Sequence, residues 1–170
     1  NYFASKNVKI SLITTSKKVK KKFVKKIRFI SPENHIWDKQ KRFIKFIICI
    51  YFLLKNYRKN KEINVFCFQG NILCILFCKM FGLKIVIRPN SSPSGWSKNY
   101  LKNLIFSKIL KLSDNIVVNS NDFKRELKSK FNLDSKCIYN PLNIDEISML
   151  SKKKIKFNFY RKNTINLISI

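Results

Sequence analysis

One stretch decides the fold: residues 114–145, DNIVVNSNDFKRELKSKFNLDSKCIYNPLNID. Residues 115–118 have an apolar, β-branched centre, which is typical of a strand covered on both faces. After the helix-capping side chains Asn121 and Asp122, large apolar residues recur at helical spacing up to residue 131. Residues 137–139 are a second apolar strand, which ends before Pro141 because proline cannot donate to a ladder. The stretch therefore predicts one strand-helix-strand crossover of a parallel sheet.

The rest of the chain alternates between the same two patterns. Apolar runs predict strands at residues 8–14, 27–30, 63–68, 84–87 and 164–170, and helices at residues 38–57, 72–81, 100–112 and around 147–150. Gly82 is expected to end the helix before it, as glycine commonly does. This alternation at short intervals predicts an α/β fold with a Rossmann-like parallel sheet and helices on both faces.

The chain is strongly basic, with 36 Lys and Arg against 9 Asp and Glu and a formal net charge of +27. Such a surplus attracts phosphate-rich partners and anionic membranes. However, the lysines are scattered, and Lys, Asn, Ile and Phe are all abundant, as in proteins from AT-rich genomes. Most aromatic residues lie within apolar strands and helices, where we expect them to pack as core. We therefore predict no specific nucleic-acid partner.

The segment at residues 38–57 has an apolar centre, residues 46–54, with lysines on both sides. This apolar centre is far shorter than the roughly 20 residues that span a bilayer. The segment therefore predicts a buried or membrane-adjacent helix. Core packing is the favoured interpretation, because helices that cover a parallel sheet are commonly apolar.

The cysteines and the single histidine do not suggest a metal site. The five cysteines contain no CxxC pair and lie within apolar runs, which is typical of reduced core residues in a cytoplasmic protein. Cys74 and Cys78 have helical spacing, but no second pair of ligands lies near them in sequence. His35 lies in a loop-like stretch and is interpreted as a surface residue.

Polar residues follow three of the predicted strands, and the carboxyl ends of parallel strands share one edge. The candidates are Arg88, Asn90, Ser91 and Ser92 after one strand, Asn119 and Ser120 after the next, and Asn140 after the last. Arg88 could hold a phosphate or carboxylate, or it could equally anchor the loop that follows. Asn119 and Ser120 could instead cap a helix, and Asn140-Pro141 could be only a turn. No glycine-rich phosphate motif or catalytic signature is present, so no catalytic residue is assigned.

The order of these motifs resembles one enzyme family. Lys84-Ile-Val-Ile-Arg-Pro-Asn90 precedes a long loop and a helix, Ser113-Asp-Asn-Ile-Val-Val-Asn-Ser120 precedes another helix, and Ile138-Tyr-Asn-Pro-Leu-Asn143 follows. This arrangement is similar to the N-terminal, acceptor-binding half of retaining glycosyltransferases of family 4, which have the two-domain GT-B architecture. Family members often carry a histidine after the strand that here ends at Ile87, where this chain has Arg88 and Asn90.

The resemblance implies an activity: transfer of a sugar from a nucleotide-sugar donor to a lipid-linked, oligosaccharide or surface-polysaccharide acceptor, as in lipopolysaccharide biosynthesis, with retention of configuration. It places Arg88, Asn90, Ser91 and Ser92 on the acceptor side, and Asn119, Ser120 and Asn140 at the donor side of an interdomain cleft. It implies no metal and no cofactor beyond the donor substrate, and a cytoplasmic location with peripheral attachment to the inner face of the plasma membrane.

The resemblance also predicts domain limits. Residues 1–147 would form the acceptor-binding domain without its first strand, and residues 148–170 the linker and first strand of a donor-binding domain. The donor-binding residues of the family would then lie beyond Ile170, and we expect the 170-residue chain alone to be inactive. The alternative hypothesis is a non-catalytic basic module that binds nucleic acid or anionic membrane.

Overall fold

The computed structural model describes residues 6, 8–16, 25–69, 71–91 and 99–152. Two compact units, Asn1–Tyr139 and Asn140–Ile170, make up the chain. The predicted domain limit at residue 147 falls within the last described helix, and the strand predicted at residues 164–170 lies outside the described residues.

In chain order the elements are β1 (Ser11–Ile13), β2 (Arg28–Ile30), the 3-10 helix η2 (His35–Lys39), α2 (Arg42–Lys59), β3 (Asn64–Cys67), α3 (Asn71–Met80), β4 (Lys84–Ile87), α4 (Tyr100–Lys111), β5 (Asn115–Val118), α5 (Asn121–Phe131), β6 (Lys136–Cys137) and α6 (Ile144–Ser151).

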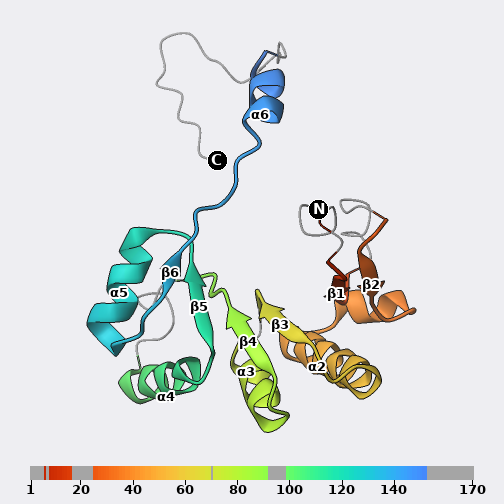
Figure 1. Cartoon of the computed structure of the whole chain (residues 1–170), viewed down its shortest axis with the longest axis horizontal. Coiled ribbons are helices and arrows are strands. Elements are labelled where there is room, and N and C mark those ends of the chain that lie inside the picture. Colours follow the sequence, from red (N-terminus) through yellow and green to blue (C-terminus); the bar gives the residue numbers. More distant parts are fainter. Residues whose placement is uncertain (1–5, 7, 17–24, 70, 92–98, 153–170) are drawn as a thin grey trace. The chain divides into compact units, whose positions relative to one another are not determined.

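The main sheet has four parallel strands in the order β3-β4-β5-β6, and β1 pairs with β2 in a separate parallel ladder. Helices α3, α4 and α5 each connect two neighbouring strands, so the strands succeed one another across the sheet as they do along the chain (Figure 1). This confirms the predicted α/β fold with a Rossmann-like parallel sheet flanked by helices, although α3, α4 and α5 pack on one face of the sheet and not on both as predicted.

One face of the sheet carries the hydrophobic core. Alternate strand residues, including Cys67, Ile85, Ile87, Ile116 and Val118, form one buried cluster. The buried side chains of the helices join the same cluster: Leu53 of α2, Cys74, Ile75, Phe77 and Cys78 of α3, Leu110 of α4, and Phe123 and Leu127 of α5. Right-handed crossovers that always step in one direction place their helices on one side of a sheet, which accounts for this arrangement.

The opposite face of the sheet is more open. Phe66 and Phe68 alternate with the buried Cys67 and are 50% and 51% exposed, and their ring centroids lie 4.8 Å apart. The expectation that aromatic residues of strands and helices pack as core is therefore wrong for these two residues, and also for Phe43 and Tyr51 of α2. The apolar pattern of a strand indicates that part of it is buried, but it does not tell which face of the sheet the helices cover.

Local signals set the ends of the helices. Gly82 has a φ of 66° and ends α3, as predicted, while the Leu83 amide bonds the Cys78 carbonyl at 2.8 Å. Helix α5 is capped by Ser120, whose hydroxyl accepts from the Phe123 amide at 3.2 Å. The predicted cap residues Asn121 and Asp122 are instead the first two residues of α5.

The five cysteines are free, as expected of reduced core residues. Three of them are buried, Cys67, Cys74 and Cys78, and two are half-buried. Burial raises the pKa of the Cys49 thiol, with a smaller contribution from nearby Cys67.

Asp114, directly before β5, links three elements. Its carboxylate accepts the Ile85 amide at the start of β4 at 2.7 Å and forms an ion pair with Lys79 of α3 at 3.1 Å. The Asp114 amide also donates to the Ile85 carbonyl at 3.0 Å. The hydrogen bond from Ile85, followed by Lys79, lowers the pKa of Asp114 below its usual value.

We predict that Asp114→Ala lowers the free energy of unfolding at neutral pH by about 1 kcal/mol, a value reduced because the carboxylate is partly exposed. A lowered pKa stabilises the fold above the ordinary carboxyl pKa, and this contribution disappears as the pH falls through the lowered value. Urea titrations should therefore show that the difference between wild type and variant shrinks below about pH 4. As a control, Asp134→Ala removes only an exposed ion pair with Lys128 and should change stability by less than about 0.5 kcal/mol. A difference between wild type and Asp114→Ala that does not vary with pH would contradict this role.

Candidate functional site

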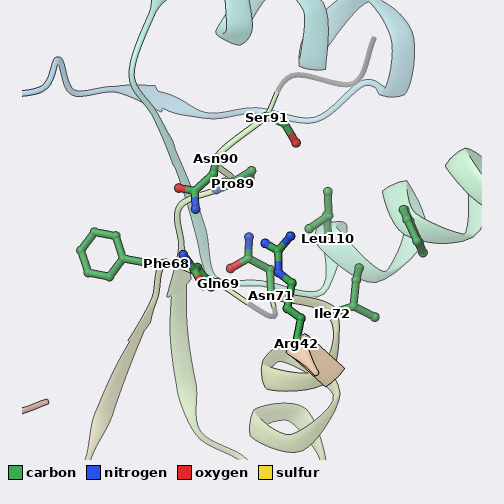
Figure 2. Close-up of a pocket in the computed structure, with 10 residues that line it drawn as sticks. Arg42, Phe68, Gln69, Asn71, Ile72, Pro89, Asn90, Ser91 and Leu110 are labelled. Carbon is green, nitrogen blue, oxygen red and sulfur yellow. The ribbon is translucent and has the colours of Figure 1, made fainter. Parts of the chain in front are cut away.

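A cavity of about 300 Å³ lies at the carboxyl ends of β3 and β4 (Figure 2). Its walls come from the start of α2, the turn between β3 and α3, the loop after β4, and one side of α4. The lining residues are Arg42, Phe68, Gln69, Asn71, Ile72, Pro89, Asn90, Ser91, Phe106 and Leu110. The position matches the edge at which open parallel sheets bind ligands.

The register of the sheet brings two of these walls together. Cys67 pairs with Ile87, and the Arg88 amide donates to the Cys67 carbonyl at 2.9 Å. Both strands therefore end at the same level. The turn that follows β3 and the loop that follows β4 consequently open into the same space.

Arg42 is the cationic side chain among the described lining residues. It is the first residue of α2, and Figure 2 shows its side chain reaching from this helix toward the side chain of Asn71, another lining residue. Its guanidinium carbon also lies 5.6 Å from the centroid of the Phe46 ring. Arginine presents several fixed donors, which suit phosphate or carboxylate groups.

Asn71 begins α3 and contributes an unsatisfied polar atom. Its Oδ1 is buried and has no hydrogen-bond partner in the part of the chain that the structure describes. Buried polar atoms normally have a partner, and one that lacks it costs about 1–3 kcal/mol. This oxygen is therefore a polar group within the wall of the cavity that is not itself exposed to a ligand.

None of the ten lining side chains is an acid or base that titrates near neutral pH. Arginine, amide and hydroxyl groups surround apolar walls formed by Ile72, Phe106 and Leu110. This combination can bind and orient a ligand with hydroxyl or anionic groups, but it offers no general acid or base. The described lining is therefore suited to holding a ligand in place.

Of the four residues predicted on the acceptor side after β4, only some line the cavity. Asn90 and Ser91 line the cavity. Arg88 does not: it is half-buried, and its guanidinium carbon lies 6.0 Å from the centroid of the Phe68 ring. Figure 2 shows that the Phe68 ring itself points away from the other lining side chains. Ser92 lies outside the described residues.

The residues predicted for the donor side, Asn119, Ser120 and Asn140, belong to two different compact units. Asn119 is exposed at the end of β5, and Ser120 caps α5. Asn140 is the first residue of the second compact unit. An interaction that the sequence did not suggest joins Asn121 to Tyr139, with the amide nitrogen 2.8 Å from the hydroxyl oxygen. The assignment of Asn119, Ser120 and Asn140 to a donor-side cleft stays a prediction.

Among residues 6, 8–16, 25–69, 71–91 and 99–152, no group of three or more His, Cys, Asp or Glu side chains is arranged to hold a metal ion. None of the described helices combines the length and the apolar character that a bilayer crossing requires. No protein-family model and no curated protein sequence matches the chain.

The unsatisfied Asn71 oxygen gives a test of the cavity. We predict that Asn71→Leu leaves the free energy of unfolding unchanged or raises it by up to about 1 kcal/mol, because a buried acceptor without a partner is removed. Ser120→Ala, which removes a cap whose bond is formed, should instead lower it by about 1 kcal/mol. Urea unfolding of both variants makes the comparison. A loss of more than about 2 kcal/mol for Asn71→Leu would show that Oδ1 is already bonded in the free protein.

Proposed function

We propose that this chain forms the acceptor-binding part of a retaining glycosyltransferase that transfers a sugar from a nucleotide-sugar to a lipid-linked or surface-polysaccharide acceptor. The observation that carries the proposal is the cavity at the carboxyl ends of β3 and β4, lined by Asn90 and Ser91. These two residues belong to the group that the motif order assigned to the acceptor side. The parallel α/β sheet agrees with the same family resemblance.

The chemistry of the cavity suits such an acceptor. The side chains of Asn90 and Ser91 can exchange hydrogen bonds with sugar hydroxyls. Arg42, next to the first turn of α3, favours an anionic group such as the phosphate of a lipid-linked sugar. On this proposal the enzyme works at the cytoplasmic face of a membrane, and the donor and catalytic residues are not among those assigned to the cavity.

We predict that the complete protein containing this chain transfers sugar from one of a panel of labelled uridine- or guanosine-diphosphate sugars to a lipid-extractable acceptor. Arg42→Ala should raise KM for the acceptor at least about tenfold and leave KM for the donor unchanged, because a hydrogen bond to a charged group is worth about 1.5–3 kcal/mol. Lys124→Ala is the matched control, since it removes an exposed base of α5, a helix that contributes no lining residue to the cavity.

Two results would contradict the proposal. One is the absence of transfer with every donor and acceptor combination. The other is an Arg42→Ala variant that impairs donor binding and leaves acceptor binding unchanged. An inverted anomeric configuration in the product, determined by nuclear magnetic resonance, would contradict retention alone.

One observation favours the second candidate, a non-catalytic module that binds nucleic acid. The open sheet face presents Phe66 and Phe68 side by side, with Arg88 near the Phe68 ring and exposed Lys84 at the start of β4. Exposed aromatic pairs on a basic sheet can stack on unpaired bases.

This candidate makes a separate prediction. At fixed salt, Phe66→Ala/Phe68→Ala should weaken binding of a labelled single-stranded oligonucleotide at least about tenfold, because stacking is worth about 1–3 kcal/mol per base. Fluorescence anisotropy at two salt concentrations measures the loss. If the variant binds as the wild type does and only salt weakens the complex, the attraction is general to the +27 chain and this candidate fails.

A further inference from the structure

Helix α2, Arg42–Lys59, has two apolar sides. One side is packed: Leu53 is buried, and Ile50, Leu54 and Tyr57 lie against the hydrophobic core. The other side is open, with Phe43 61%, Ile44 36%, Ile47 50% and Tyr51 60% exposed. We call these four residues the outer stripe. Phe43, Ile47 and Tyr51 are spaced by four residues, so they lie one above another on the helix.

The sequence prediction for this segment, a helix in the core, is thus confirmed for one side only. Packing against the core does not require the outer stripe to be apolar, and surface helices normally carry polar residues there. Contiguous exposed apolar residues on a helix commonly mark a surface that binds a partner or a membrane.

The charge of α2 indicates which kind of partner fits. The helix contains five bases and no Asp or Glu. Lys55 and Arg58, both exposed, continue the outer stripe at helical spacing beyond Tyr51. Within the described residues, none of the ion pairs involves a base of α2. A second copy of the chain would bring like charges together, whereas an anionic surface would neutralise them.

We propose that the outer stripe of α2, with Lys55 and Arg58, docks this protein on the surface of a bilayer that contains anionic lipids. The helix lies in the plane of the interface, with the stripe inserted between headgroups and the bases paired with lipid phosphates. At 1.5 Å per residue, its 18 residues extend for roughly 27 Å along the surface.

This docking would also position the cavity. Arg42 lines the cavity and Phe43, the next residue, begins the outer stripe, so the cavity and the membrane contact share one end of α2. A lipid-linked acceptor could then reach the cavity without leaving the bilayer. This last step rests on the proposed function, whereas the docking itself does not.

The test is co-sedimentation of the 170-residue chain with phosphatidylcholine vesicles, with and without about one third phosphatidylglycerol. The wild type should bind the anionic vesicles and bind the neutral ones at least tenfold more weakly. Phe43→Ser/Ile47→Ser/Tyr51→Ser should reduce binding to anionic vesicles at least tenfold, and Lys55→Gln/Arg58→Gln by a similar factor. Circular dichroism before each assay checks that the variants are folded, which is expected because the changed side chains are exposed.

The matched control changes an equally exposed apolar set on another helix. Leu101→Ser/Ile105→Ser/Leu112→Ser, on and next to α4, replaces side chains that are 67%, 57% and 49% exposed. It should bind anionic vesicles within about twofold of the wild type. Equal losses in the two triple variants, or no binding of the wild type to anionic vesicles, would overturn the proposal. So would a wild-type dimer that the α2 triple variant abolishes in sedimentation equilibrium.

A final comparison separates the docking from the proposed transferase. In the complete protein, the α2 triple variant should keep transfer to a water-soluble acceptor and lose at least tenfold in transfer to an acceptor embedded in vesicles. Vesicle binding without any sugar transfer would contradict the proposed function and leave the docking intact. Transfer to a soluble acceptor without vesicle binding would contradict the docking and leave the proposed function intact.

Discussion

The structure depends on the burial of one apolar sheet face beneath α2, α3, α4 and α5. Ile85, Ile87 and Val118 are fully buried at the centre of this layer, and Ile75 and Leu127 are fully buried on the helices above it. Packing of this kind fixes the strand order and register, because a shift by one residue would turn every buried side chain toward solvent. The register in turn ends β3 and β4 at the same level and thereby creates the cavity.

The same constraint explains how much of the fold the sequence predicts. The limits of β4 and β5 match their predicted ranges, since Gly82 ends the helix before β4 and Asp114 precedes β5 with polar residues after it. The strand predicted at 8–14 shortens to Ser11–Ile13, and the strand predicted at 137–139 is shorter and begins one residue earlier, as Lys136–Cys137. Apolar composition gives the centre of a strand, but its ends depend on which neighbour supplies hydrogen bonds.

The site is predicted less completely for a related reason. Asn90 and Ser91 follow a strand, so the chain itself places them at the binding edge. The sequence does not predict Arg42 as a lining residue. It lines the cavity only because the start of α2 packs beside the turn after β3, and this contact arises from tertiary packing. Arg88 follows the buried Ile87, and the alternation of strand residues could have indicated that it lies on the open face with Phe68.

A protein with 36 basic side chains will attract anions at many places on its surface. A test of ligand binding at the cavity must therefore report on individual residues. Backbone amide chemical shifts of the isotope-labelled chain, recorded while a water-soluble glycosyl phosphate is added, test the central claim most directly. The account predicts saturable changes concentrated on Gln69, Asn71, Asn90 and Ser91 and abolished by Arg42→Ala. Changes spread over the exposed lysines, weakened by salt and unaffected by Arg42→Ala, would contradict it.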